Sequence, residues 1–240
     1  LMGPTKRGKS HFGVWFGRTA LLLGIPVLHV TLELRDELLA QRYDRCFSQM
    51  NTFEVREHPE QMEEKIRETV KDLSLLRIVA APRYTLTLGE VEDLVEDALQ
   101  DFGQRMLLIL DYGSILKRDQ RKPKHEAVEE IHERLSGLAM EKLIPIWTPY
   151  QTNRTAFTSG EEDIHLGQSG DSYGSTLHAD LILTLNRSKA EKIKRRMRLT
   201  MEGARDTDEV TAVVQYDWGR SSVYPIGEAD GGEEDHRPKG

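Results

Sequence analysis

The sequence predicts an α/β fold in which a mostly parallel sheet is flanked by helices and ends in a C-terminal antiparallel hairpin. Three observations lead to this fold class. Short apolar segments alternate with longer segments of helical periodicity through most of the chain. Residues 3–10 match the pattern G-x-x-x-x-G-K-[ST], which joins a buried strand to a helix. Near the C-terminus, a short turn separates strand-like segments at 197–201 and 209–217.

The composition is that of a globular protein. The 240 residues are 38% hydrophobic and 30% charged, with a net charge of −7. This balance gives no general attraction to nucleic acid, so such binding requires local basic patches. The single cysteine, Cys46, cannot form an intrachain disulfide, which favours a reducing compartment and a cytoplasmic protein. We expect one domain over residues 1–226 and a disordered acidic tail over 227–240.

Each predicted element follows from its local pattern. Apolar residues at helical spacing predict helices at residues 11–23, 35–50, 58–72, 88–102 and 126–141. Apolar runs typical of strands buried on both faces predict strands at 26–33, 76–81, 106–112, 144–149 and 177–185. Polar or basic segments predict loops or surface stretches at 117–125, 152–175 and 188–196.

The first motif predicts a phosphate-binding loop, although the same pattern also occurs in surface turns. The loop comprises Gly3, Pro4, Thr5, Lys6, Arg7, Gly8, Lys9 and Ser10. Its glycines let backbone N–H groups turn towards an anion, Lys9 can bind the β- and γ-phosphates of ATP, and the Ser10 hydroxyl can bind Mg²⁺. Only two residues precede the loop. We therefore expect an incomplete first strand in this sequence, unless another segment takes its place.

Polar residues end three of the predicted strands, where ligands of such sheets bind. Asp111 can complete a Mg²⁺ shell with Ser10, or it can cap the next turn. Glu33 can orient or deprotonate the water that attacks the γ-phosphate, or it can stabilise the N-terminus of the following helix. Gln151 can hydrogen-bond the γ-phosphate and report its loss, or it can be an ordinary polar strand end.

The order of the motifs resembles the C-terminal motor domain of DnaB-type replicative helicases, which are RecA-like ATPases, and above all their phage-like members. The matching segments are the phosphate loop, TLEL at 31–34, LDYGSIL at 110–116, QTNR at 151–154 and SGDSYGSTLHADLILTLNR at 169–187. The resemblance implies a hexameric ring that hydrolyses ATP with Mg²⁺ at subunit interfaces and moves along single-stranded DNA during replication. It implies catalytic roles for Lys9, Glu33 and Gln151, and an arginine finger at Arg205 that reaches the neighbouring subunit.

The resemblance also implies contacts with primase or a loader through an N-terminal domain that this sequence does not include. Two positions depart from the family pattern: Gly203 stands where a lysine usually precedes the finger, and Tyr150 stands where a serine usually precedes the sensor glutamine. For DNA, a basic segment predicts either a phosphate contact or a solvated loop. Its cations are Lys117, Arg118, Arg121, Lys122 and Lys124.

Two other functions remain open. The chain can be a RecA- or KaiC-like ATPase that acts in recombination or regulation without unwinding DNA. It can also be a nucleotide-dependent scaffold that does not hydrolyse ATP. Strand displacement on a forked substrate distinguishes the first alternative from a helicase, and phosphate release distinguishes the second.

Overall fold

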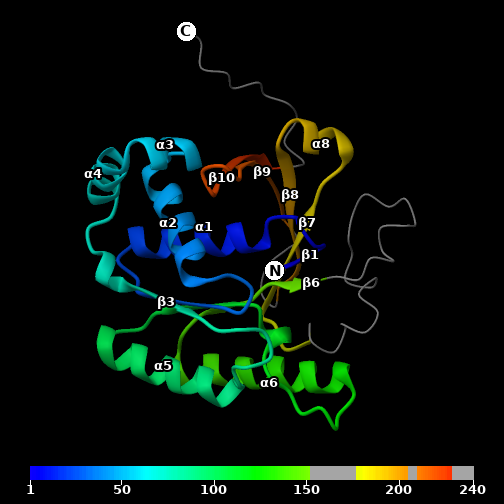
Figure 1. Cartoon of the computed structure of the whole chain (residues 1–240). Helices are drawn as coiled ribbons and strands as arrows, with labels where there is room; N and C mark the ends of the chain where they lie inside the picture. The colour runs from blue at the N-terminus through cyan, green and yellow to red at the C-terminus, as the bar shows by residue number, and fades with distance from the viewer. Residues whose placement is uncertain (152–176, 205–209, 229–240) are drawn as a thin grey trace.

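The computed structural model describes residues 1–151, 177–204 and 210–228. In Figure 1 a central sheet separates one layer that contains α1 to α4 from a second layer that contains α5 and α6. The expected loop at 152–175 and most of the expected tail lie outside the described residues. The predicted α/β class with a C-terminal antiparallel hairpin is confirmed by this arrangement.

The parallel half of the sheet is built from six short strands. They are β1 (Met2–Gly3), β2 (Val27–Thr31), β3 (Leu76–Ala80), β4 (Leu107–Asp111), β5 (Ile146–Trp147) and β6 (Tyr150–Gln151). The strands form two hydrogen-bonded sets. One set has the order β3-β2-β4-β5, and the other set includes the parallel pair β1 and β6. Because only two residues separate β5 from β6, this segment joins the two sets of strands. The carboxyl ends of β1, β2, β4 and β6 therefore meet at one edge.

The other half of the sheet is antiparallel beyond β7 (Leu181–Asn186), which still pairs in parallel with β1. It continues through β8 (Arg196–Ala204), β9 (Thr211–Asp217) and β10 (Ser222–Glu228). Strand β10 was not expected, because Pro225 and Gly227 interrupt its pattern. The structure accommodates both with a register shift between these residues on the edge strand. Residues 227 and 228, expected in the tail, belong to this strand.

The helices agree with the predicted ones except at short elements. The long helices are α1 (Lys9–Leu22), α2 (Asp36–Ser48), α4 (Pro59–Thr69), α5 (Leu88–Phe102) and α6 (Lys124–Lys142). Two short helices were missed, α3 (Thr52–Glu57) and α8 (Lys189–Ile193). Both begin at capping boxes, Asn51 with Glu54 and Ser188 with Glu191, a pattern that the sequence shows. Helix α6 begins two residues earlier than predicted, inside the expected basic loop, and β7 begins four residues later.

Side chains of the central strands alternate between two hydrophobic cores. Leu28 and Leu110 pack against α5 and α6, whereas Val27 and Ile109 pack against α1 and α2. All five residues of β2 are buried, as expected for a strand covered by helices on both faces. Among the described helices, none combines the length and the apolar composition needed to cross a membrane.

An apolar cavity of about 590 Å³ lies beside the start of the chain, between α1 and α6. Its lining includes Ile146 of β5 and Leu183 of β7. On this side β7 pairs with β1 at Met2 and Thr184. The α-amino group of Leu1 donates a hydrogen bond to the Thr148 carbonyl oxygen at 2.9 Å, and burial lowers the pKa of this amine to about 5.

Candidate nucleotide-binding and catalytic site

The phosphate loop turns into α1 at Gly8. This residue has φ +91° and caps the helix, and its carbonyl oxygen accepts hydrogen bonds from the N–H groups of His11 at 2.9 Å and Phe12 at 3.0 Å. A Cβ atom at this position would overlap the ring of Trp218. Glycine is therefore required at position 8 both by the left-handed backbone and by the close approach of the indole.

The ammonium group of Lys9 folds back over its own loop. Its Nζ atom donates hydrogen bonds to the carbonyl oxygens of Gly3 at 2.7 Å and Pro4 at 2.8 Å. Burial lowers the pKa of Lys9 to about 8, while the carboxylates of Asp111 and Glu33 act in the opposite direction. This lysine can exchange two carbonyl partners for phosphate oxygens, which would favour its charged form.

Asp111 ends β4 beside Ser10. Its side chain is almost completely buried, and burial raises the pKa of the carboxyl group, whereas a hydrogen bond with Ser10 lowers it. Among the described residues, the Oδ2 atom of Asp111 has no hydrogen-bond partner, although it is buried. An unsatisfied carboxylate oxygen next to a hydroxyl fits Mg²⁺, which is usually held by one or two protein groups together with waters and substrate phosphates. No cluster of three or more His, Cys, Asp or Glu side chains that could hold a metal occurs in the described part of the chain.

Glu33 follows β2, and two side chains from neighbouring strands lie near it. Arg83, in the turn after β3, forms an ion pair with its Oε1 atom. The side chain of Tyr112, directly after Asp111, lies near the Glu33 carboxylate, and its hydroxyl donates a hydrogen bond to Gln151 Oε1 at 3.4 Å. Burial, and then the nearby charge of Glu33, raise the pKa of Tyr112 to about 12. The phenol therefore stays protonated and remains a donor at neutral pH.

Gln151 connects this group to the phosphate loop. Its Nε2 atom donates a hydrogen bond to the Thr5 hydroxyl at 2.6 Å, and its Oε1 atom lies 3.4 Å from the Tyr112 hydroxyl. A polar chain thus runs from Thr5 through Gln151 and Tyr112 to Glu33. The structure brings Lys9, Ser10, Glu33, Asp111 and Gln151 to one edge of the sheet, as the strand ends predict.

Sequence reasoning gave no site role to Arg42 of α2. Its guanidinium group is largely buried, and burial lowers the pKa of Arg42, while Asp111 and Glu33 act against this change. Its Nη1 atom has no hydrogen-bond partner among the described residues. A buried cation beside two carboxylates reduces their mutual repulsion. This contact depends on how α2 packs over the sheet, so no local pattern predicts it.

A second group that sequence reasoning missed lines a pocket of about 510 Å³ next to the phosphate loop. The rings of Tyr216 and Trp218 are stacked with centroids 4.4 Å apart, and Trp218 also stacks on His11 at 4.7 Å. Arg187 donates a hydrogen bond to the Tyr216 hydroxyl at 2.7 Å. The sequence did contain a signal for this group. Tyr216 and Trp218 are aromatic residues at the end of a predicted strand, and residues two apart in a strand lie on the same face.

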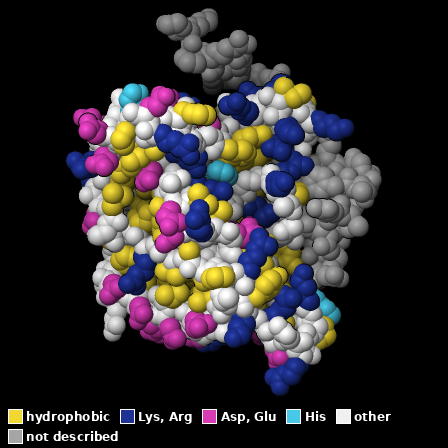
Figure 2. All heavy atoms as spheres, viewed as in Figure 1, with side chains coloured by type: hydrophobic (Ala, Val, Ile, Leu, Met, Phe, Trp, Pro, Cys, Tyr) yellow, Lys and Arg dark blue, Asp and Glu magenta, His cyan; other side chains and the backbone are white. Residues whose placement is uncertain are grey.

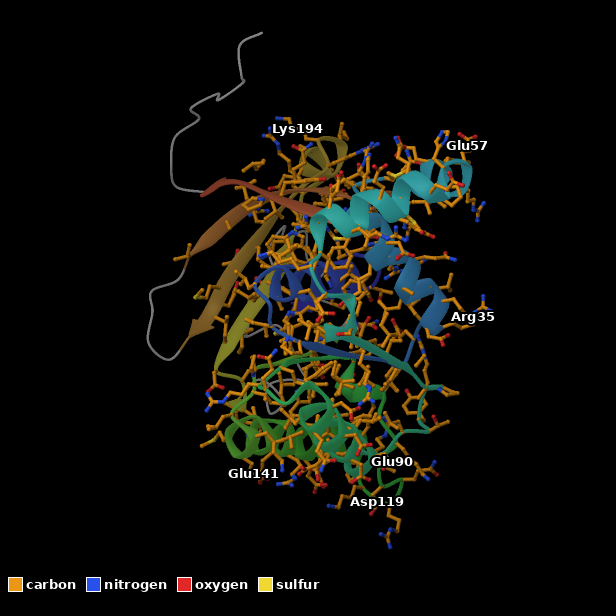
Figure 3. All side chains as sticks on the ribbon, turned by 90° about the vertical axis from the view of Figure 1, so that its left-hand side faces the viewer. Arg35, Glu57, Glu90, Asp119, Glu141 and Lys194 are labelled. Carbon is orange, nitrogen blue, oxygen red and sulfur yellow. The ribbon has the colours of Figure 1, made fainter. Side chains whose placement is uncertain are left out.

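The basic segment, residues 117–124, lies apart from this pocket, on the side of α5 and α6. Figure 3 shows Asp119, in its middle, at the lower edge of the molecule near Glu90. Arg121 pairs with Asp119 and Lys122 pairs with Glu130. The other three cations, Lys117, Arg118 and Lys124, form no ion pair within the described residues. In Figure 2 a further group of Lys and Arg side chains gathers over α8 and β8. The predicted finger Arg205 lies outside the described residues.

Comparison with known proteins agrees with this geometry. The family model "DnaB-like helicase C terminal domain" matches residues 2–217. No curated protein matches the chain significantly. One similar solved structure is an ATPase domain, with a TM-score of 0.82 at 15% identity, over 94% of this chain and 83% of that one.

Another similar solved structure is "The Structure Of A DnaB-Like Replicative Helicase And Its Interactions With Primase". It has a TM-score of 0.80 at 15% identity, over 91% of this chain, and this chain spans 55% of that protein's length. At such identities the two structures establish the RecA-like fold, and the family model covers nearly all of the sequence. The chain therefore belongs to the DnaB-like helicase C-terminal domain family, a family of ATP-hydrolysing helicase domains.

Proposed function

We propose that this chain is the motor of a replicative DNA helicase, which hydrolyses ATP between subunits and translocates along single-stranded DNA. The observation that carries the proposal is the convergence of Lys9, Ser10, Glu33, Asp111 and Gln151 at one edge of the sheet. Family membership supports it, as does the similarity to a replicative helicase studied with primase. A composite site of this kind suits phosphoryl transfer, which needs positioning and charge stabilisation.

Each residue has a role that follows from its place. Lys9 binds the β- and γ-phosphates once it leaves its two carbonyl partners. Ser10 and Asp111 would hold Mg²⁺, which would neutralise phosphate charge. Glu33 orients the attacking water and accepts its proton, and Gln151 contacts the γ-phosphate. Because Gln151 already contacts Thr5 and lies near Tyr112, loss of the phosphate changes contacts on both sides of it.

The pocket lined by Tyr216 and Trp218 adjoins the phosphate loop and has room for the base of the nucleotide. The faces of the two rings are already covered by each other, by His11 and by Arg187. Lys6, Arg7 and Arg187, which line the same pocket, suit the adjoining phosphates. This placement puts the base on the side of β8 and β9 and the reacting phosphate near Glu33.

Assembly completes the site in this proposal. A cytoplasmic hexameric ring would place Arg205 of one subunit at the nucleotide of its neighbour, where an arginine typically adds about 10³–10⁵ in rate. DNA would contact Lys117, Arg118, Arg121, Lys122 and Lys124. A ring repeats these cations in every subunit, which offsets the acidic total charge. Primase or a loader would bind through an N-terminal domain outside this sequence.

The test measures phosphate release with and without single-stranded DNA, together with strand displacement on a forked substrate. Lys9→Ala is expected to lower DNA-stimulated turnover by at least about 100-fold, because it removes a charge from the transition state. Lys142→Ala is the matched control, since Lys142 forms an ion pair with Glu96 far from the site. Turnover retained in Lys9→Ala would contradict the assigned site. DNA-stimulated hydrolysis without strand displacement would favour the RecA- or KaiC-like ATPase, and nucleotide binding without phosphate release would favour the scaffold.

A further inference from the structure

The turn Pro82–Thr85 contacts the candidate site and the basic segment at the same time. It follows β3 at the edge of the parallel sheet. On one side Arg83 forms the ion pair with Glu33. On the other side, the guanidinium group of Arg118 lies over the ring of the next residue, Tyr84, 5.3 Å from its centroid. Adjacent residues of one turn thus contact the proposed general base and a cation of the proposed DNA-binding segment.

Backbone hydrogen bonds attach this turn to the chain that follows β4. The N–H of Tyr84 donates to the Ile115 carbonyl oxygen at 2.9 Å, and the N–H of Lys117 donates to the Leu86 carbonyl oxygen at 2.8 Å. Tyr84 has φ +61°, a conformation that a residue with a side chain rarely adopts. Such a conformation persists only where the surroundings hold it. These bonds connect the turn to the start of the basic segment, so a displacement of that segment would act on the turn.

In the described arrangement the polar groups of the site bind one another. Arg83 donates to the Glu33 carboxylate, which leaves it fewer lone pairs for a water molecule. Lys9 is bonded to the carbonyl oxygens of its own loop. At the other end, the Nη1 atom of Arg118 is buried and has no hydrogen-bond partner among the described residues. The candidate site is therefore in a resting arrangement, and Arg118 beside it has a guanidinium nitrogen without a hydrogen-bond partner among the described residues.

We propose that the turn Pro82–Thr85 couples DNA binding to ATP hydrolysis, with Arg83 as a positioning residue for Glu33. The inference rests on the function proposed above. In the resting state Arg83 holds the Glu33 carboxylate. A DNA phosphate that binds the guanidinium group of Arg118 forms a charge-assisted hydrogen bond, which is stronger than the contact of that group with an aromatic ring. Arg118 then leaves Tyr84, the turn moves, and Arg83 releases Glu33 to the attacking water.

Two variants separate the two ends of this connection. Arg83→Ala is expected to raise phosphate release without DNA by about two- to five-fold, the change in population that a partly exposed ion pair supports. The ratio of rates with and without DNA falls correspondingly. Tyr84→Asn removes the ring but tolerates the left-handed backbone, so it breaks the contact with Arg118 in the absence of DNA. The rate without DNA is therefore expected to rise, and the ratio of rates with and without DNA to fall. Arg83→Lys retains a cation and is expected to keep the low basal rate.

Arg77→Ala is the matched control, because Arg77 lies on β3 and pairs with Asp101 away from the site. The rate of phosphate release without DNA, and the ratio of the rates with and without DNA, are expected to equal those of the wild type in this variant. The inference is wrong if Arg83→Ala leaves the basal rate at or below the wild-type value, or if Tyr84→Asn keeps the full ratio.

A measurement independent of hydrolysis separates this inference from the proposed function. Hydrogen exchange of the Tyr84 amide is expected to speed up when an oligonucleotide is added, in the wild type and equally in Lys9→Ala. Unchanged exchange with bound oligonucleotide overturns the coupling even where DNA stimulates the ATPase. Faster exchange in a wild-type protein that releases no phosphate would support movement of the turn on DNA binding and would contradict the proposed hydrolysis.

Discussion

The pKa of Lys9 leads to a quantitative prediction about nucleotide binding. Burial holds this pKa at about 8 in the nucleotide-free protein, below the ordinary lysine value of 10.5. Phosphates stabilise the ammonium form, so the neutral amine must take up a proton when nucleotide binds. The charged fraction falls from about 0.76 at pH 7.5 to about 0.09 at pH 9.0. The dissociation constant of a non-hydrolysable ATP analogue is therefore expected to rise about eight-fold, or about 1.2 kcal/mol, over this interval.

The measurement is titration calorimetry at the two pH values with Mg²⁺ held constant. At pH 9.0 binding should take up about 0.9 proton, which makes the observed enthalpy depend on the ionisation enthalpy of the buffer. Lys9→Arg is the control, because a guanidinium stays charged throughout this range and its affinity should show no such pH dependence. Equal affinity of the wild type at both pH values, or the same slope in Lys9→Arg, would refute the assignment of Lys9 as a buried, titrating phosphate ligand.

Two further predictions concern the ends of the phosphate loop. Gly8→Ala is expected to abolish nucleotide binding and to lower the free energy of unfolding by more than the ~1–2 kcal/mol that a left-handed backbone costs a residue with a side chain, because its methyl group also displaces Trp218. Gly24 has φ +75° and open space around it, so Gly24→Ala is expected to cost only this backbone contribution. Thermal unfolding and nucleotide binding compare the two variants, and equal losses would contradict the role of the indole contact. Four β-branched residues joined ahead of Leu1 are expected to extend β1, fill the apolar cavity and raise the melting temperature by about 4 °C or more relative to four serines. An equal melting temperature for the two extensions would argue against the apolar cavity as a place for further apolar residues.

Local patterns were sufficient for most of the fold and for the centre of the site. The apolar runs that end in Glu33, Asp111 and Gln151 could be recognised without coordinates, because a strand covered by helices on both faces needs apolar residues along its length. Parallel strands place their carboxyl ends at one edge, so the meeting of these residues with the loop at 3–10 followed from topology. Helices α3 and α8 were missed although their capping boxes are visible in the sequence, so there the information was present but unused.

Other features arise only from packing between segments far apart in the chain. Arg83 reaches Glu33 across 50 positions, and Trp218 covers Gly8 from the far end of the sheet. Arg42 reaches the carboxylates only because α2 packs over the strands that carry them. A hydrophobic period or a motif predicts local structure from residues that are close in sequence. These contacts depend instead on the register of the strands and the packing angles of the helices. The sequence alone therefore determined the residue types of the candidate site and the loop that holds Lys9, whereas the folded sheet decided which distant residues contact Glu33, Asp111 and Gly8.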